Sequence, residues 1–147
     1  YIKMRLKCNV HSWMESIFFA YKDHNCNSSH LIDEWTLVHF LSGVIFKILF
    51  PFVSLFWILI IHIIFELIEN SENGHAIVNA INPHLYSGDS WINAIGDTIV
   101  FVLGAYLVKS TPYLRNRKNY LTIFTLCALL YVSVFSFDYI KTEIIDY

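Results

Sequence analysis

Charged residues are scarce in this chain, and the few present nearly cancel. Lys, Arg, Asp and Glu together make up 15% of 147 residues, against about 25% in ordinary soluble domains. The formal net charge is −2, so the chain lacks the basic surface that nucleic-acid binding requires. The three cysteines, Cys8, Cys26 and Cys127, are too few for a disulfide framework. Cys127 lies in an apolar run, and we expect it to be chemically inert.

Apolar residues take the place of the missing charge. Hydrophobic residues make up 56% of the chain and aromatic residues 17%, with a mean hydropathy of +0.49. This composition predicts one integral membrane domain over residues 1–147, because the chain is too short for two. The expected partner is the lipid bilayer, with no nucleic acid. The expected location is a bacterial-type inner membrane or an organellar inner membrane such as that of mitochondria.

Four apolar runs predict transmembrane helices, because about 20 apolar residues cross a bilayer. We predict an all-α fold: a helical bundle over residues 33–137, preceded by an interfacial and polar segment over 1–32 and followed by a polar tail over 138–147. A short amphipathic helix over Val10–Tyr21 is expected to lie at the interface or to pack on the bundle. The four predicted spans are Asp33–Phe50, Phe52–Asn70, Asp89–Val108 and Asn119–Phe137, with polar loops over 71–88 and 109–118.

The loops differ in charge, and this difference predicts an orientation. Lys109, Arg115, Arg117 and Lys118 cluster in the loop between the last two spans. Short loops rich in Lys and Arg remain on the cytoplasmic side of a membrane. We therefore place this loop in the cytoplasm or in the equivalent compartment of an organelle, and the loop over 71–88 on the opposite side.

Ionisable residues inside three of the spans form the most informative pattern. His62, Glu66 and Glu69 recur at helical spacing in one span, and Asp89, Asn93 and Asp97 do so in another. Such residues are costly inside a membrane and are candidates for a functional site. From their similar depths we predict one polar cluster between the helices. Its members are His39, His62, Glu66, Glu69, Asn70, Asp89, Asn93 and Asp97.

Two interpretations of this cluster remain open. Carboxylates with one or two imidazoles suit a divalent metal ion, and Glu66, Glu69, Asp97 and His39 are the candidate ligands. Such an ion could activate water against a phosphate or acyl ester. Alternatively, the same side chains hold neighbouring helices together through hydrogen bonds. Other residues receive simpler interpretations: His24, His30, His75 and His84 are expected to be solvated, and Gly43, Gly96 and Gly104 to permit close approach of helices.

Three motifs resemble a family of small polytopic bacterial inner-membrane proteins of unknown function, best known from alpha-proteobacteria. The first motif runs from Ser28 through His30, Asp33, Thr36 and His39 to Gly43, with Ser42 where the family has a second histidine. The second is the E-x-x-E-N-S pattern that begins at Glu66, and the third is the Y-x-G-D-S-x-x-N-x-x-x-D pattern from Tyr86 to Asp97. The resemblance covers residues 28–108. It implies a polytopic membrane protein that keeps this polar set together, and it supplies no activity. A fainter similarity to VanZ-like membrane proteins rests on topology and a few acidic positions.

These observations support two hypotheses of different class. The first is a non-catalytic accessory or structural subunit of a membrane complex, which predicts other membrane subunits as partners. The alternative is a membrane-embedded, metal-dependent hydrolase or transferase that acts on a lipid-linked substrate.

Overall fold

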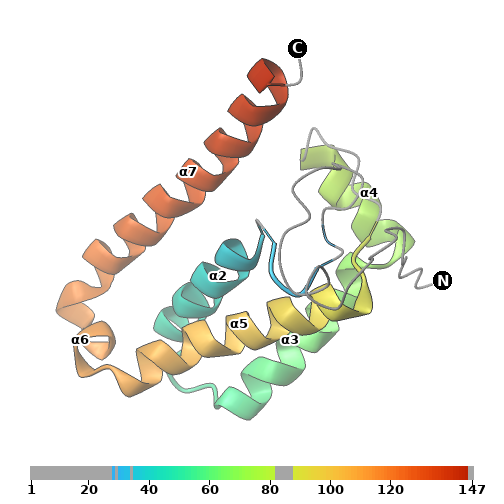
Figure 1. Cartoon of the computed structure of the whole chain (residues 1–147). Coiled ribbons are helices and arrows are strands. Elements are labelled where there is room, and N and C mark those ends of the chain that lie inside the picture. The colour runs from blue at the N-terminus through green and yellow to red at the C-terminus, as the bar shows by residue number, and fades with distance from the viewer. Residues whose placement is uncertain (1–27, 29, 34, 82–87, 146–147) are drawn as a thin grey trace.

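Helices make up the regular structure of this chain (Figure 1). The computed structural model describes residues 28, 30–33, 35–81 and 88–145, and within these it contains no strand. The predicted all-α class is therefore confirmed, whereas the interfacial helix predicted over Val10–Tyr21 lies outside the described residues. The helices are α2 (Thr36–Leu49), α3 (Leu55–Glu69), α4 (Glu72–Ile81), α5 (Trp91–Ser110), α6 (Pro112–Arg115), the 3₁₀ helix η2 (Arg117–Asn119) and α7 (Tyr120–Ile145).

Reciprocal hydrogen bonds between Asp33 and Thr36 define the start of α2. Asp33 Oδ1 accepts from the backbone N–H groups of Trp35 at 2.8 Å and Thr36 at 3.1 Å. The Asp33 N–H in turn donates to Thr36 Oγ1 at 2.9 Å. Such bonds satisfy N–H groups that have no partner within the helix. The Asp33 side chain thus stabilises the backbone just before and at the start of α2.

A tight turn at Pro51 separates α2 from α3. Pro51 has no N–H group and restricts the residue before it, so α2 ends at Leu49. The Lys47 ammonium donates to the carbonyl oxygens of Pro51 and Val53 and so satisfies two acceptors of the turn. Ser54 then caps α3 by accepting from the Trp57 N–H at 3.4 Å. The chain therefore reverses direction in an α2–α3 hairpin whose two helices both pack against α5.

Close packing of α2 against α5 forms the centre of the fold, and small residues permit it. A Cβ atom on Gly43 would lie 2.0 Å from the carbonyl oxygen of Phe101, and one on Gly104 would lie 2.2 Å from that of Phe40. Only residues without a side chain fit at these two crossings. The predicted role in close helix approach is therefore confirmed for Gly43 and Gly104, whereas Gly96 permits the close approach of Leu31, which precedes α2.

Apolar side chains pack beside this crossing in two clusters. One cluster fills the space between α2, α5 and α7, and the other lies between α3 and α5. The buried members of the first are Leu41, Val44, Ile48, Val108, Ile123 and Cys127, and those of the second are Ile58, Phe101 and Ala105. Cys127 is a free, buried thiol, in agreement with the inert role expected for it.

The predicted loops and tail contain more helix than the sequence indicated. The segment over 71–88 was predicted as a loop but contains α4, whose first turn is stabilised by Ser71 Oγ accepting from the Gly74 N–H at 3.2 Å. Glu72 adds a negative charge at the positive end of this helix. The segment over 109–118 includes α6 and part of η2, and α7 continues through most of the predicted tail to Ile145.

Helix length limits how many segments can cross a bilayer. In the described part of the chain, α5 is the one helix that is long and apolar enough to span a membrane. The 14 residues of α2 and the 15 of α3 rise only about 21–23 Å, short of the roughly 30 Å hydrocarbon core. The predicted bundle of four transmembrane helices is therefore not confirmed. In Figure 1, α7 runs beside α2 and extends beyond the other helices.

Candidate functional site

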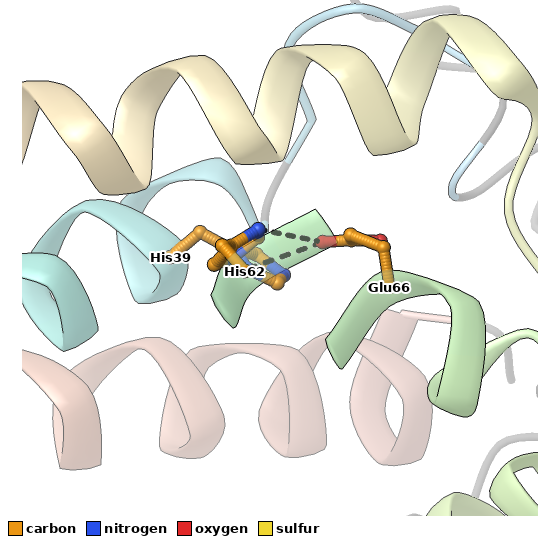
Figure 2. Close-up of side chains that lie close together, drawn as sticks. All are labelled: His39, His62 and Glu66. Carbon is orange, nitrogen blue, oxygen red and sulfur yellow. Dashed lines mark hydrogen bonds and ion pairs between the residues drawn. The ribbon is translucent and has the colours of Figure 1, made fainter. Parts of the chain in front are cut away.

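Two histidines and a glutamate meet between α2 and α3 (Figure 2). His62 and Glu66 lie one turn apart on α3, so both face α2, where His39 is located. The Nδ1 atom of His39 lies 3.2 Å from Nε2 of His62. Glu66 Oε1 lies 3.5 Å from His62 Nδ1 and 3.8 Å from His39 Nδ1. Figure 2 shows both imidazoles directed toward the same carboxylate oxygen.

A threonine and a phenylalanine from α5 fix the ring of His62. Thr98 Oγ1 lies 3.1 Å from His62 Nδ1, within hydrogen-bond distance. The Phe101 ring packs on the imidazole with centroids 4.2 Å apart. Only 2% of His62 is exposed. With Nδ1 occupied by the threonine, Nε2 is the nitrogen that faces His39.

The carboxylate of Glu66 is buried without a hydrogen bond from any described residue. Glu66 is 3% exposed, and neither of its oxygens has a hydrogen-bond partner in this part of the chain. Buried polar atoms are nearly always satisfied, so an exception calls for an explanation. Among the described residues, its ion-pair partners are His39 and His62 alone. The surroundings of Glu66 therefore favour a bound cation or proton.

Asp97 of α5 lies behind His39. Its Oδ2 atom is 3.7 Å from His39 Nε2, on the opposite side of the ring from His62. The Thr36 hydroxyl donates to Asp97 Oδ1 at 3.5 Å. Asp97 is 2% exposed. A carboxylate on the outer nitrogen of a histidine orients the ring and makes its inner nitrogen more basic.

Other members of the polar cluster are satisfied by direct hydrogen bonds. Asn70 donates through Nδ2 to Asp89 Oδ2 at 3.0 Å, and its Oδ1 accepts from the Asp89 N–H at 2.7 Å. Asn93 donates to Asp33 Oδ2 at 3.1 Å and to the His30 carbonyl oxygen at 2.8 Å. These bonds join α3 to the start of α5, and α5 to the segment before α2. This half of the cluster fits the structural interpretation.

Burial also changes the acidity of Asp33, which precedes α2. Desolvation raises the pKa of Asp33 to about 6, and the negative charge of Asp89 acts in the same direction. Hydrogen bonds from the N–H groups of Trp35 and Thr36 oppose this shift in the pKa. The burial cost exceeds the gain from these bonds, so Asp33 carries a proton near pH 5.

In two groups of side chains, the nitrogen and oxygen atoms lie close enough together to bind one metal ion. One group is His39, His62 and Glu66, and the other is Glu66, Glu69 and Asp89; within each group one ligand atom per residue lies within 4.8 Å of the others. Zn–ligand bonds of 2.0–2.2 Å place tetrahedral ligand atoms about 3.3–3.6 Å apart. In the first group, His39 Nδ1 lies 3.2 Å from His62 Nε2 and 3.8 Å from Glu66 Oε1, and both distances are close to this range.

The structure places the residues of the predicted polar cluster near one another, but in separate groups. His39, His62 and Glu66 meet at one point between the helices, and Asp97 lies on the other side of the His39 ring. Glu69, Asn70 and Asp89 adjoin it at the end of α3, and Asn93 bonds toward Asp33 instead. Of the four candidate metal ligands named from sequence, Asp97 lies outside both ligand groups, and His62 takes its place in the first.

Some functional contacts were missed from sequence. Neither Asp33 nor Thr98, which is next to Asp97, is among the residues predicted from sequence for the cluster. His30 is 4% exposed, so the prediction that it is solvated was wrong; its neighbour Leu31 contacts Gly96 of α5, which buries this segment against the bundle.

Comparison with known proteins places the chain among proteins of unknown function. Residues 5–134 match a family described as protein of unknown function (DUF2585). The chain is also similar to the cytochrome c biogenesis protein CcsA of Dioscorea elephantipes, with 27% identity over 118 residues. This alignment covers 74% of the chain but only 36% of that protein, so the chain spans about a third of its length. No solved structure matches the chain significantly.

Proposed function

The chain belongs to the DUF2585 family of proteins of unknown function, and from this premise we propose that it is a membrane-embedded metalloprotein. One divalent metal ion binds to His39, His62 and Glu66, between α2 and α3. The observation that carries the proposal is the Glu66 carboxylate, which is buried without a hydrogen bond yet 3.5 and 3.8 Å from two imidazoles. A cation between the three side chains explains both facts.

Two neighbouring residues prepare the histidines for such an ion. Asp97 lies near Nε2 of His39, so the Nδ1 atom of this ring is turned toward His62 and Glu66. Thr98 lies near Nδ1 of His62, which is also 3.5 Å from Glu66 Oε1, and Nε2 of this ring is turned toward His39. Metal-bound histidines have partners of this kind almost invariably. The arrangement is of the type found around zinc, iron and manganese ions in proteins.

The number of ligands suggests a catalytic rather than a purely structural ion. Two histidines and one glutamate leave a fourth position for water or substrate, as in catalytic zinc sites, whereas structural zinc sites are closed by four protein ligands. An ion held by His39, His62 and Glu66 would supply activation of water against an acyl or phosphoryl ester, with the products an acid and an alcohol.

The surroundings of the proposed site suggest a lipid-linked substrate. Phe65 is 49% exposed on the outer face of α3, and its ring centroid lies 6.4 Å from that of His39. Ile61, Ile64 and Ile68 also expose large apolar side chains on this helix. The His39 side chain itself remains 15% exposed. A substrate with an apolar chain could reach the imidazole past this surface.

The test of metal binding is a melting curve in detergent. The purified protein is measured with chelator and then with Zn²⁺, Mg²⁺ or Ca²⁺. A ligand at 100 times its dissociation constant stabilises the folded state by about 2.7 kcal/mol. We expect metal to raise the melting temperature of the wild type and not that of Glu66→Gln. The control is Glu72→Gln, an exposed glutamate in the next helix, which should respond like the wild type. An unresponsive wild type would overturn the proposal.

A non-catalytic accessory role is the second candidate, and the Asn70–Asp89 and Asn93–Asp33 hydrogen bonds favour it. A hydrolysis assay separates the two. Metal-loaded protein in vesicles is incubated with a long-chain acyl ester and a long-chain alkyl phosphate ester of para-nitrophenol. The enzyme proposal predicts release of nitrophenol that Glu66→Gln abolishes. Release from neither substrate, in protein that binds metal, would support the accessory role.

A further inference from the structure

Glu66 belongs to both groups of candidate ligand atoms. Its Oε1 atom faces the imidazoles of His39 and His62, while Oε2 is buried without a hydrogen bond. The second group comprises Glu66, Glu69 and Asp89, with one oxygen of each within 4.8 Å of the others. A carboxylate with two buried, unbonded oxygens between two such groups has the arrangement of a bridging ligand.

The side chain of Asn70 holds Asp89 in place for this second group. Asn70 is fully buried, and it bonds to Asp89 through both its Nδ2 and its Oδ1 atoms. The Asn70 Nδ2 also donates to the carbonyl oxygen of Glu66 at 3.0 Å. This amide thus ties the end of α3 to the residue before Ser90, the N-cap of α5. Asp89 is consequently positioned beside Glu66 and Glu69 before any ion arrives.

Among the described residues, no lysine or arginine forms an ion pair with Glu66 or Glu69. Glu69 Oε2 is buried without a hydrogen bond, like both oxygens of Glu66. The one lysine of α2, Lys47, bonds to Pro51 and Val53 at the far end of that helix. Several buried carboxylates at one place need a cation or protons to offset their charge.

We propose that Glu66, Glu69 and Asp89 bind a second divalent cation beside the first, so that Glu66 bridges a two-metal centre. The inference rests on the proposed function, because Glu66 is shared. Three carboxylates offer only oxygen ligands, which favours Mg²⁺ or Mn²⁺ at this position. Two ions about 3.5–4 Å apart clamp the attacking and leaving oxygens of a phosphoryl group. The substrate class is therefore a phosphate ester, carried by a lipid.

Manganese provides the direct test, because two bridged Mn²⁺ ions couple magnetically. Purified protein is loaded with Mn²⁺, freed of excess ion, and examined by elemental analysis and electron paramagnetic resonance. We expect two ions per chain and a spin-coupled spectrum in the wild type and in the control Glu72→Gln. Glu69→Gln and Asp89→Asn should each retain one ion with an uncoupled six-line spectrum. Two different variants protect the test against the failure of either one to fold.

The possible outcomes separate this inference from the function on which it rests. One ion per chain in the wild type, unchanged in Glu69→Gln and Asp89→Asn and lost in His62→Ala, would overturn the second position and keep the first. Two ions without magnetic coupling would overturn the bridge. The absence of bound ions from the wild type would overturn both proposals.

Discussion

His39 and His62 face each other with Nδ1 and Nε2 only 3.2 Å apart, across the two arms of the α2–α3 hairpin. At this distance the two nitrogens share one proton, which either ring can donate. A metal ion at the same place would replace that proton. The contact between the two rings can thus form with a proton or with a metal ion between them. The carboxylates of Glu66 and Asp97 lie within 4 Å of His39, so replacing the proton by an ion would change their electrostatic surroundings.

Asp97 tests whether the cluster holds an ion or only joins helices. Asp97→Asn keeps the shape of the side chain but removes the charge that lies 3.7 Å from His39 Nε2. We expect a 10- to 100-fold weaker metal affinity, the usual effect of losing such a partner. Without metal, the melting temperature should barely change, because polar contacts between membrane helices average about 0.6 kcal/mol. Equal Zn²⁺ affinities for variant and wild type would exclude this role for Asp97.

The raised pKa of Asp33 predicts that the stability of the folded protein depends on pH. Burial raises the pKa of Asp33 from 3.8 to about 6 in the folded protein, so between these values the folded state binds more protons than the unfolded state. The contribution of Asp33 to the free energy of unfolding is therefore largest below about pH 4. It falls by up to about 3 kcal/mol as pH rises through 6.

The Asp33→Asn variant isolates this effect. Melting temperatures of the wild type and the variant are compared from pH 4 to pH 7, and other titrating groups cancel in the difference. The advantage of the wild type should shrink as pH increases. An advantage that stays constant or grows with pH would show that the pKa of Asp33 is not raised in the folded protein.

Gly43 tests the crossing of α2 and α5. An added methyl group would lie 2.0 Å from the Phe101 carbonyl oxygen, which belongs to rigid backbone. We expect Gly43→Ala to destabilise the protein by about 1–3 kcal/mol or more, because the two helices must move apart. The control, Ser42→Ala, changes the neighbouring, partly buried residue and should have a smaller effect. Similar melting temperatures for both variants would mean that the helices are not packed this closely.

The positive charges near α6 predict an orientation for the proposed membrane protein. With the native cysteines replaced by serine, a single cysteine at Asn116 should be shielded from a membrane-impermeant thiol reagent added outside intact cells. A single cysteine at Asn79 of α4 should react. The reason is the positive-inside rule applied to Lys109, Arg115, Arg117 and Lys118. The reverse labelling pattern would overturn the orientation.

Helical periodicity was enough to predict which side chains share a face. The spacing of His62 and Glu66 placed both on one side of α3, and the motif residues Asn70 and Asp89 indeed meet. Sequence could not show which residues would pair across helices, because this depends on the crossing of α2 with α5. As a result, Thr98 was missed, and Asn93 was grouped with Glu66 although it bonds toward Asp33.

Helix boundaries were predicted less well where local polar residues decide them. The segment after Asn70 is rich in Asn, Glu, Gly and His, which is typical of a loop, yet Ser71 and Glu72 start a helix there. Conversely, the apolar runs around Pro51 look long enough for two spans, but the turn between them uses five residues, 50–54. This turn leaves α2 and α3 shorter than apolar composition suggested.

The central claim, a metal ion held by two histidines and a glutamate, is tested most directly by X-ray absorption of the zinc-loaded protein. The account predicts first-shell nitrogen and oxygen atoms at about 2.0–2.1 Å, with outer-shell scattering from two imidazole rings. His39→Ala should reduce the signal to one ring. A spectrum without imidazole scattering in the wild type, or one that His39→Ala leaves unchanged, would contradict it.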